Sequence, residues 1–307
     1  MDNIEFDIVN KELTEIICNA IYESKKNIPL IFASSSQVEK NNPYGESKMA
    51  AEQAIKKLNN ETGNPVNIYR LPGVFGKWCK PNYNSVVATF CYNICHDLPI
   101  KVNTSDELTL VYIDDVVSEL IDTIQNNAVH KIECSVKPEY KITVDKLANL
   151  ISKFRNSRKD FFIEEVGDGL TRALYSTYAS YLSPEHFSYK VPSNEDDRGL
   201  FCELFKTSSG QFSFFTAFPG VSRGGHYHHS KTEKFVVIKG IAQFRFKNII
   251  SNDTHEIKVS HNELTIVDTV PGWVHNITNI GNEELIVIIW ANEIFDKQNP
   301  DTISSEV

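Results

Sequence analysis

A tyrosine and a lysine lie four residues apart in the segment NNPYGESKMAAEQ, at residues 41–53. On a helix this spacing puts Tyr44 and Lys48 on one face, one turn apart. An ammonium group near a phenol favours the phenolate, so Tyr44 is a candidate proton donor or acceptor near neutral pH. A serine at the end of the preceding strand could bond the same substrate oxygen, and SSSQ supplies Ser34, Ser35 and Ser36. The alternative for the pair is a surface tyrosine and a solvated lysine.

A second set of residues has the types and spacing of metal ligands. In GGHYHHSKTEKF, His226 and His228 are two apart on an expected strand, so both point to the same face. Glu233 follows after a short connection, and VPGWVHNITN brings His275. Three imidazoles and one carboxylate suit a divalent metal with a coordination position open to water or substrate. The alternative is scattered histidines on a β-rich domain, which the spacing of both motifs disfavours.

The elements around Tyr44 alternate between helix and strand. KELTEIICNAIYESKK has apolar residues at helical spacing, and IPLIFASSS is apolar like a strand covered on both faces. Asn42 can cap the next helix, with Pro43 at its first position. Two further strands and a helix are expected at 66–76, 108–117 and 143–154. This alternation predicts a parallel sheet flanked by helices.

After about residue 185 the pattern changes to short, closely spaced strands with Gly, Asn and Pro between them. Such a pattern without helix signals predicts an antiparallel sandwich or barrel. We therefore expect an α/β domain at residues 1–165, a linker at 166–195 and an all-β domain at 196–307.

Composition limits the classes of function. With 307 residues, 41% of them hydrophobic, the chain can build two cores. A formal charge of −9 without a Lys/Arg cluster argues against a nucleic-acid or anionic-membrane partner. Six cysteines without a CxxC pair fit a reducing compartment. No signal peptide or long apolar run is evident, so we expect a cytoplasmic protein that does not span a membrane.

The surroundings of Tyr44 resemble the extended short-chain dehydrogenase/reductase family, whose members act on nucleotide sugars. The resemblance rests on the strand ending in serines, the Pro-capped helix and YRLPGVFG, where Gly73 stands at the family's usual Asn. It implies that Tyr44 is the catalytic acid/base and that Lys48 holds the nicotinamide ribose and tunes Tyr44. It also implies that Ser36 polarises the substrate carbonyl, with Ser35 as the alternative.

The sequence departs from this family in one further respect. Ahead of Tyr44 there is no Gly-rich turn of the kind that holds a dinucleotide pyrophosphate. We therefore expect a truncated Rossmann-type sheet with an exposed edge, and weak binding of NADPH by this chain alone. An impaired reductase half would follow. An exposed edge also favours association, and a homodimer is expected.

The histidine motifs resemble those of the cupin superfamily, a small antiparallel jelly-roll barrel. The resemblance implies that His226, His228, Glu233 and His275 bind a divalent metal, with Zn²⁺ expected. DDRGLFCELFKT resembles the opening of cupin sugar epimerases. Arg198 would then bind a diphosphate or a sugar hydroxyl, and the alternative is a surface salt bridge with a neighbouring Asp.

Together the two halves resemble the bifunctional enzymes of capsule and O-antigen synthesis. The resemblance implies a UDP-2-acetamido-2,6-dideoxy-4-keto-hexose as substrate, C3 epimerisation by the cupin, and C4 reduction with NADPH toward a UDP-N-acetyl-6-deoxy-L-hexosamine. The C3 proton is acidic only because the C4 carbonyl can become an enolate, so such a site needs oxyanion stabilisation and a base. The sequence leaves open which residue is the base, and whether the metal is catalytic or structural. The alternative functions are other small-molecule chemistry at the metal, or a non-catalytic partner of an intact reductase.

Overall fold

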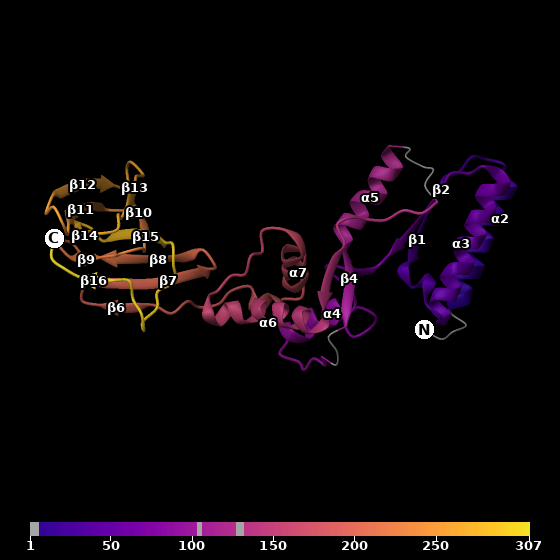
Figure 1. Cartoon of the computed structure of the whole chain (residues 1–307), viewed down its shortest axis with the longest axis horizontal. Coiled ribbons are helices and arrows are strands. Elements are labelled where there is room, and N and C mark those ends of the chain that lie inside the picture. The colour runs from indigo at the N-terminus through magenta and orange to yellow at the C-terminus, as the bar shows by residue number, and fades with distance from the viewer. Residues whose placement is uncertain (1–5, 103–105, 127–131) are drawn as a thin grey trace. The chain divides into compact units, whose positions relative to one another are not determined.

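The computed structural model of the chain describes residues 6–102, 106–126 and 132–307. The chain forms two compact units. One holds the chain up to Ser152 together with Asp168–Leu182, and the other holds Lys153–Gly167 and Ser183–Val307. Helices and parallel strands build the first unit and antiparallel strands the second, so the predicted mixed fold class is confirmed (Figure 1). No described helix is long and apolar enough to cross a membrane.

The described elements of the first part of the chain are, in order, η1 (Asp7–Glu12), α2 (Leu13–Ser24), β1 (Leu30–Ser35), η2 (Ser36–Glu39), α3 (Pro43–Thr62), β2 (Val66–Leu71), β3 (Gly73–Phe75), α4 (Val86–Cys95), β4 (Glu107–Tyr112), α5 (Ile113–Gln125), β5 (Tyr140–Thr143), α6 (Val144–Asp160) and α7 (Gly169–Ala179).

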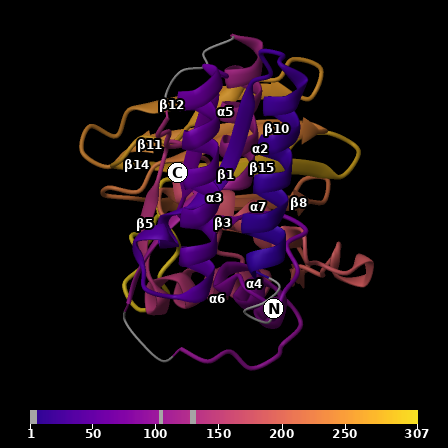
Figure 2. The same ribbon diagram turned by 90° about the vertical axis from the view of Figure 1, so that its right-hand side faces the viewer.

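Helix α3, which carries Tyr44 and Lys48, begins where its sequence predicts. The Asn42 side chain accepts a hydrogen bond from the Gly45 N–H at 2.8 Å, and Pro43 occupies the first turn. Strands β1 and β2 are parallel, and α2 and α3 lie side by side against them (Figure 2). The shared core is apolar and consists of Cys18, Ile21, Ile55, Leu58, Val66 and Ile68. It packs the second half of α3 against the first residues of β2.

The expected strand at 66–76 is divided in the structure. Pro72 has no N–H to donate to a ladder, and it separates β2 from β3. Strand β3 pairs in parallel with β4, and β5 lies antiparallel on the other side of β4. The expected strand at 108–117 ends at Tyr112, where α5 takes over.

The segment 166–195, expected as a linker, contains helix α7. This helix buries Ala173, Leu174 and Tyr178 and contacts α4, so it belongs to the first unit. The predicted domain boundaries remain predictions.

The second unit contains η3 (Pro184–His186), β6 (Asn194–Asp196), β7 (Gly199–Thr207), β8 (Gly210–Ala217), β9 (Ser222–Tyr227), β10 (Glu233–Lys239), β11 (Ile241–Asn248), β12 (Thr254–Ser260), β13 (Ile266–Asp268), β14 (Trp273–Asn279), β15 (Leu285–Ala291) and β16 (Ile303–Ser304). One sheet has the order β13-β10-β15-β8-β7-β6 and the other β12-β11-β14-β9-β16. The two sheets bury a common core that includes Phe215, Phe235, Phe244, Ile277, Leu285 and Val287.

Candidate metal centre and candidate reductase site

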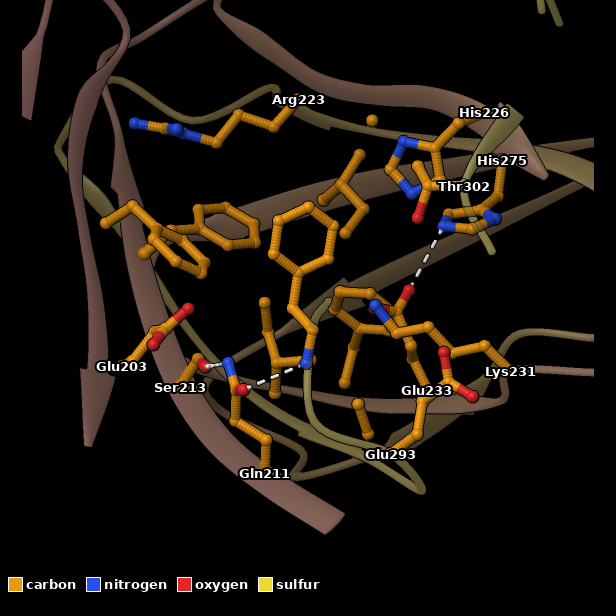
Figure 3. Close-up of a pocket in the computed structure, with 18 of the residues that line it drawn as sticks. Glu203, Gln211, Ser213, Arg223, His226, Lys231, Glu233, His275, Glu293 and Thr302 are labelled. Atoms are coloured by element: carbon orange, nitrogen blue, oxygen red, sulfur yellow. Dashed lines mark hydrogen bonds and ion pairs between the residues drawn. The ribbon is translucent and has the colours of Figure 1, made fainter. Parts of the chain in front are cut away.

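The four predicted metal ligands come together in the second unit. His226 lies on β9 and His275 on β14 of one sheet, while Glu233 opens β10 of the other. Alternation along β10 and β14 turns Glu233 and His275 inward. His228 directly follows β9, and one ligand atom from each of the four residues lies within 4.8 Å of the others. Figure 3 shows His226, Glu233 and His275 at the cavity wall.

A glycine bulge brings His226 opposite His275. The two histidines are register partners, but the next residue of β14, Asn276, pairs with Gly224, so Gly225 is an extra residue in β9. Gly224 and Gly225 have φ of +100° and +81°, a region that other residues rarely adopt. The bulge bends β9 and aims His226 at the cluster.

We expect Gly224→Ala to disturb the candidate metal centre. A Cβ at this position would lie 2.8 Å from the His275 carbonyl oxygen, and the residue would keep a strained positive φ. The strain should lower the free energy of unfolding by about 1–3 kcal/mol and should weaken zinc affinity. Gly220→Ala is the matched control, because Gly220 has φ of +78° with nothing within 4 Å of the added Cβ. Equal zinc affinity of the two variants, measured by chelator competition, would contradict this expectation.

The donor atoms of the cluster fit a divalent cation. His275 is 1% exposed, and neither of its ring nitrogens has a hydrogen-bond partner. The Nδ1 of His228 faces the carbonyl oxygen of Asp301, and its Nε2 lies 3.2 Å from Oε2 of Glu233. Both partners are acceptors, whereas a neutral imidazole carries a single N–H. A cation between Nε2 and the carboxylate removes this conflict.

The charge states of the cluster also suit a metal. Burial, together with the neighbouring His275 and His228, lowers the pKa of His226 to about 4, so its ring is neutral at pH 7. Burial alone would raise the pKa of Glu233, but the hydrogen bond with His228, the adjacent His275 ring and the charge of Lys231 place it below its usual range. Lys231 Nζ lies 3.1 Å from Glu233 Oε1. The site therefore offers the neutral His226 imidazole and one carboxylate.

The cluster opens into a cavity of about 750 Å³ inside the second unit. Arg198 lines it, but the exposed guanidinium also donates to Oδ2 of Asp196 through Nε at 3.0 Å, so the predicted alternative salt bridge does form. Arg223 lines the cavity as well and donates from Nε to the Thr216 carbonyl at 2.9 Å (Figure 3). The sequence reasoning missed Arg223, although it stands three residues before His226.

Two of the three predicted reductase residues share a cavity. Ser36 and Tyr44 line a space of about 1000 Å³ in the first unit, together with Ser35. The Ser35 hydroxyl accepts the Gln37 N–H at 3.2 Å and its residue is buried, whereas Ser36 is exposed, so Ser36 is the more accessible of the two. Lys48 donates to the Ala33 carbonyl at 3.1 Å and is absent from the described lining of this cavity. Burial lowers the pKa of Lys48.

Comparison with known protein families gives one match in each half of the chain. Residues 10–134 match the NAD dependent epimerase/dehydratase family, and residues 194–303 match the polysaccharide biosynthesis C-terminal domain. The UDP-2-acetamido-2,6-beta-L-arabino-hexul-4-ose reductase of Pseudomonas aeruginosa is 53% identical over 305 residues, which cover 99% of this chain and 82% of that protein.

Solved structures agree along nearly the whole chain. The capsular polysaccharide assembling protein CapF of Staphylococcus aureus is 41% identical with a TM-score of 0.88, over 96% of this chain and 82% of CapF. A structure of CapF with the inhibitor 3-isopropenyl-tropolone is 38% identical with a TM-score of 0.85, over 95% of this chain and 83% of that one.

Fold, sites and comparisons together define an epimerase/dehydratase-type domain joined to a cupin-type polysaccharide biosynthesis domain. The chain belongs to the family of bifunctional UDP-sugar epimerase–reductases of capsular polysaccharide biosynthesis, and it is an enzyme of nucleotide-sugar biosynthesis.

Proposed function

We propose that the barrel of this chain epimerises C3 of a UDP-2-acetamido-2,6-dideoxy-4-keto-hexose, and that the first unit carries the residues for C4 reduction with NADPH. The product would be a UDP-N-acetyl-6-deoxy-L-hexosamine. The observation that carries the proposal is the cluster of His226, His228, Glu233 and His275 at the wall of a sugar-sized cavity. The name of the Pseudomonas aeruginosa relative, a UDP-linked 2-acetamido-hexul-4-ose reductase, supports this class of substrate.

The residues of the barrel would divide the chemistry between them. The three histidines and Glu233 would hold a divalent metal, proposed to be Zn²⁺, which when bound supplies positive charge for a developing enolate oxygen. The base must then lie outside this ligand set. Glu203 and Glu293 are carboxylates that line the same cavity, and either could take the C3 proton. Arg198 at the cavity wall is the proposed diphosphate contact.

In the first unit, Tyr44 would transfer a proton to the C4 oxygen, and Ser36 would hydrogen-bond the same oxygen. Their shared cavity supports this pairing. Lys48 is proposed to bind the nicotinamide ribose. The match to the NAD-dependent family supports a nicotinamide cofactor, with NADPH as the proposed form.

Two further proposals concern the state of the protein in the cell. A homodimer is proposed because α2 exposes apolar side chains, including Leu13, Ile16 and Ile17, that a second copy could cover. A cytoplasmic location is proposed because none of the six cysteines, all of them within the described residues, forms a disulfide.

The test is incubation of the 307-residue protein with the UDP-linked 4-keto sugar in deuterated water, with and without NADPH. We expect deuterium at C3 in both incubations, because epimerisation by proton transfer needs no hydride from NADPH. The variants Glu203→Gln and Glu293→Gln should show which glutamate is the base, since only the variant that lacks the base should lose deuterium exchange at C3. Failure of wild-type protein to exchange the C3 proton would contradict the proposed epimerase activity. Steady oxidation of NADPH in the presence of the substrate would support C4 reduction by the first unit.

A further inference from the structure

The C-terminal end of the described chain forms a strap across the candidate metal centre, which we define as residues 301–305. Strand β16 pairs with the edge of β9 opposite β14, with Ser304 next to His226 and Ile303 next to Tyr227. The Ser305 N–H donates to the Gly225 carbonyl at 3.0 Å. The strap therefore covers the strand that presents the first predicted ligand.

Asp301 binds the connection between two ligands through its carboxylate. This connection runs from His228 to Glu233. Its backbone N–H groups donate to the Asp301 carboxylate at 2.8 Å from His229, 2.7 Å from Ser230 and 2.8 Å from Lys231. The Ser230 hydroxyl adds a fourth bond at 3.0 Å. Charge-assisted bonds of this kind are stronger than neutral ones, so the carboxylate fixes the shape of the loop.

The backbone of Asp301 acts on His228 itself. Its carbonyl oxygen is the hydrogen-bond partner of His228 Nδ1. Because a carbonyl can only accept, Nδ1 carries the proton, and Nε2 keeps its lone pair on the side of Glu233 and the cluster. A single residue thus anchors the loop and selects the histidine tautomer. The neighbouring Thr302 lines the cavity beside His226 (Figure 3).

We infer that Asp301 is a positioning residue for the metal centre, which presents His228 Nε2 to the metal and sets the spacing from His228 to Glu233. Supporting residues of this kind usually change metal affinity by roughly 10–100-fold when they are removed. The inference rests on the proposed metal site. It assigns a role to a residue 73 positions after the ligand that it orients.

The test measures zinc affinity by chelator competition for wild type, Asp301→Ala, Asp301→Asn and Asp296→Ala. Asp296 is the matched control, because it lies in the same C-terminal segment and accepts only a local bond from Gln298 N–H in the described structure. We expect Asp301→Ala to weaken zinc binding by roughly 10–100-fold. Asp301→Asn keeps one acceptor oxygen and should show a smaller loss, and Asp296→Ala should match wild type.

Imidazole nitrogen shifts of the zinc-loaded protein give a second readout, which also remains available if Asp301→Ala folds poorly. We expect wild-type His228 to be protonated at Nδ1 and bound through Nε2. Zinc bound through Nδ1, or unchanged affinity in a folded Asp301→Ala, would overturn the inference while leaving the metal site standing. Absence of zinc binding by wild type would instead remove the metal site on which the inference rests.

Discussion

His275→Ala is expected to remove divalent metal binding from the barrel and, with it, C3 exchange. His275 is buried at 1% exposure, its ring nitrogens have no hydrogen-bond partner, and Nε2 lies 3.5 Å from Glu233 Oε2. Loss of a direct ligand should weaken zinc binding by more than the roughly 10–100-fold typical of supporting residues. Chelator competition measures the affinity directly. Glu233→Gln, which is nearly isosteric and leaves no cavity, should weaken zinc binding as His275→Ala does.

Thermal unfolding provides an independent measurement of the same loss. A ligand at a thousandfold excess over its Kd stabilises the native state by about 4.1 kcal/mol, so zinc should raise the Tm of wild type. It should leave the Tm of His275→Ala unchanged. His255→Ala is the control, because His255 is an exposed histidine on β12 of the same sheet as His275. Tight zinc binding by both ligand variants would show that the cluster is not the metal site.

Arg70→Met is expected to destabilise the first unit by about 3–5 kcal/mol, the usual cost of breaking a buried ion pair from one side. Glu52 is 0% exposed and accepts bonds from Arg70 Nη2 at 2.8 Å, Arg70 Nε at 3.0 Å and Ser34 Oγ at 2.6 Å. Ser34 lies on β1 and Glu52 on α3, so this network ties the serine run to the helix of Tyr44. Without Arg70 the buried carboxylate would keep only Ser34 Oγ and, at 3.7 Å, Lys56 Nζ as partners.

The double variant Arg70→Met/Glu52→Gln should recover part of this loss, because it removes the buried negative charge of Glu52. Hydrogen exchange of β1 and β2 amides in denaturant reports the first unit alone, which matters because a chain with two units need not unfold in one step. Glu61→Gln is the control, since Glu61 lies on the same helix in an exposed pair with Lys57 at 3.9 Å. An effect of Arg70→Met no larger than that of Glu61→Gln would contradict the prediction.

The network also has a defined pH dependence. Burial raises the pKa of Glu52, but hydrogen bonds from Arg70 and Ser34 outweigh it, and the folded pKa lies below the ordinary value of 4.5. The stabilisation is therefore present above about pH 4.5 and is lost as the pH falls through the folded pKa. Glu52→Gln should remove this dependence.

The motifs of the chain were sufficient to predict that His226, His228, Glu233 and His275 come together, because two histidines two apart on a strand share one face. Their role as metal ligands stays a prediction. The motifs were insufficient to predict Asp301, Lys231 or Arg223 as neighbours of the cluster. No local pattern marks Asp301, since its partners lie about 70 residues earlier in the chain. The glycine pair in RGGH was visible, but its role as a bulge depends on the register with β14.

By itself the sequence determined the two classes of fold and the residue types at each site, because hydrophobic periodicity and capping act over one or two turns or one strand. Only the tertiary structure decided which side chains meet. It divided the strand at Pro72, placed α7 in the first unit, turned Lys48 to the Ala33 carbonyl and closed the strap over His228. These outcomes depend on pairing between segments distant in the chain, and no periodicity of a single segment encodes such pairing.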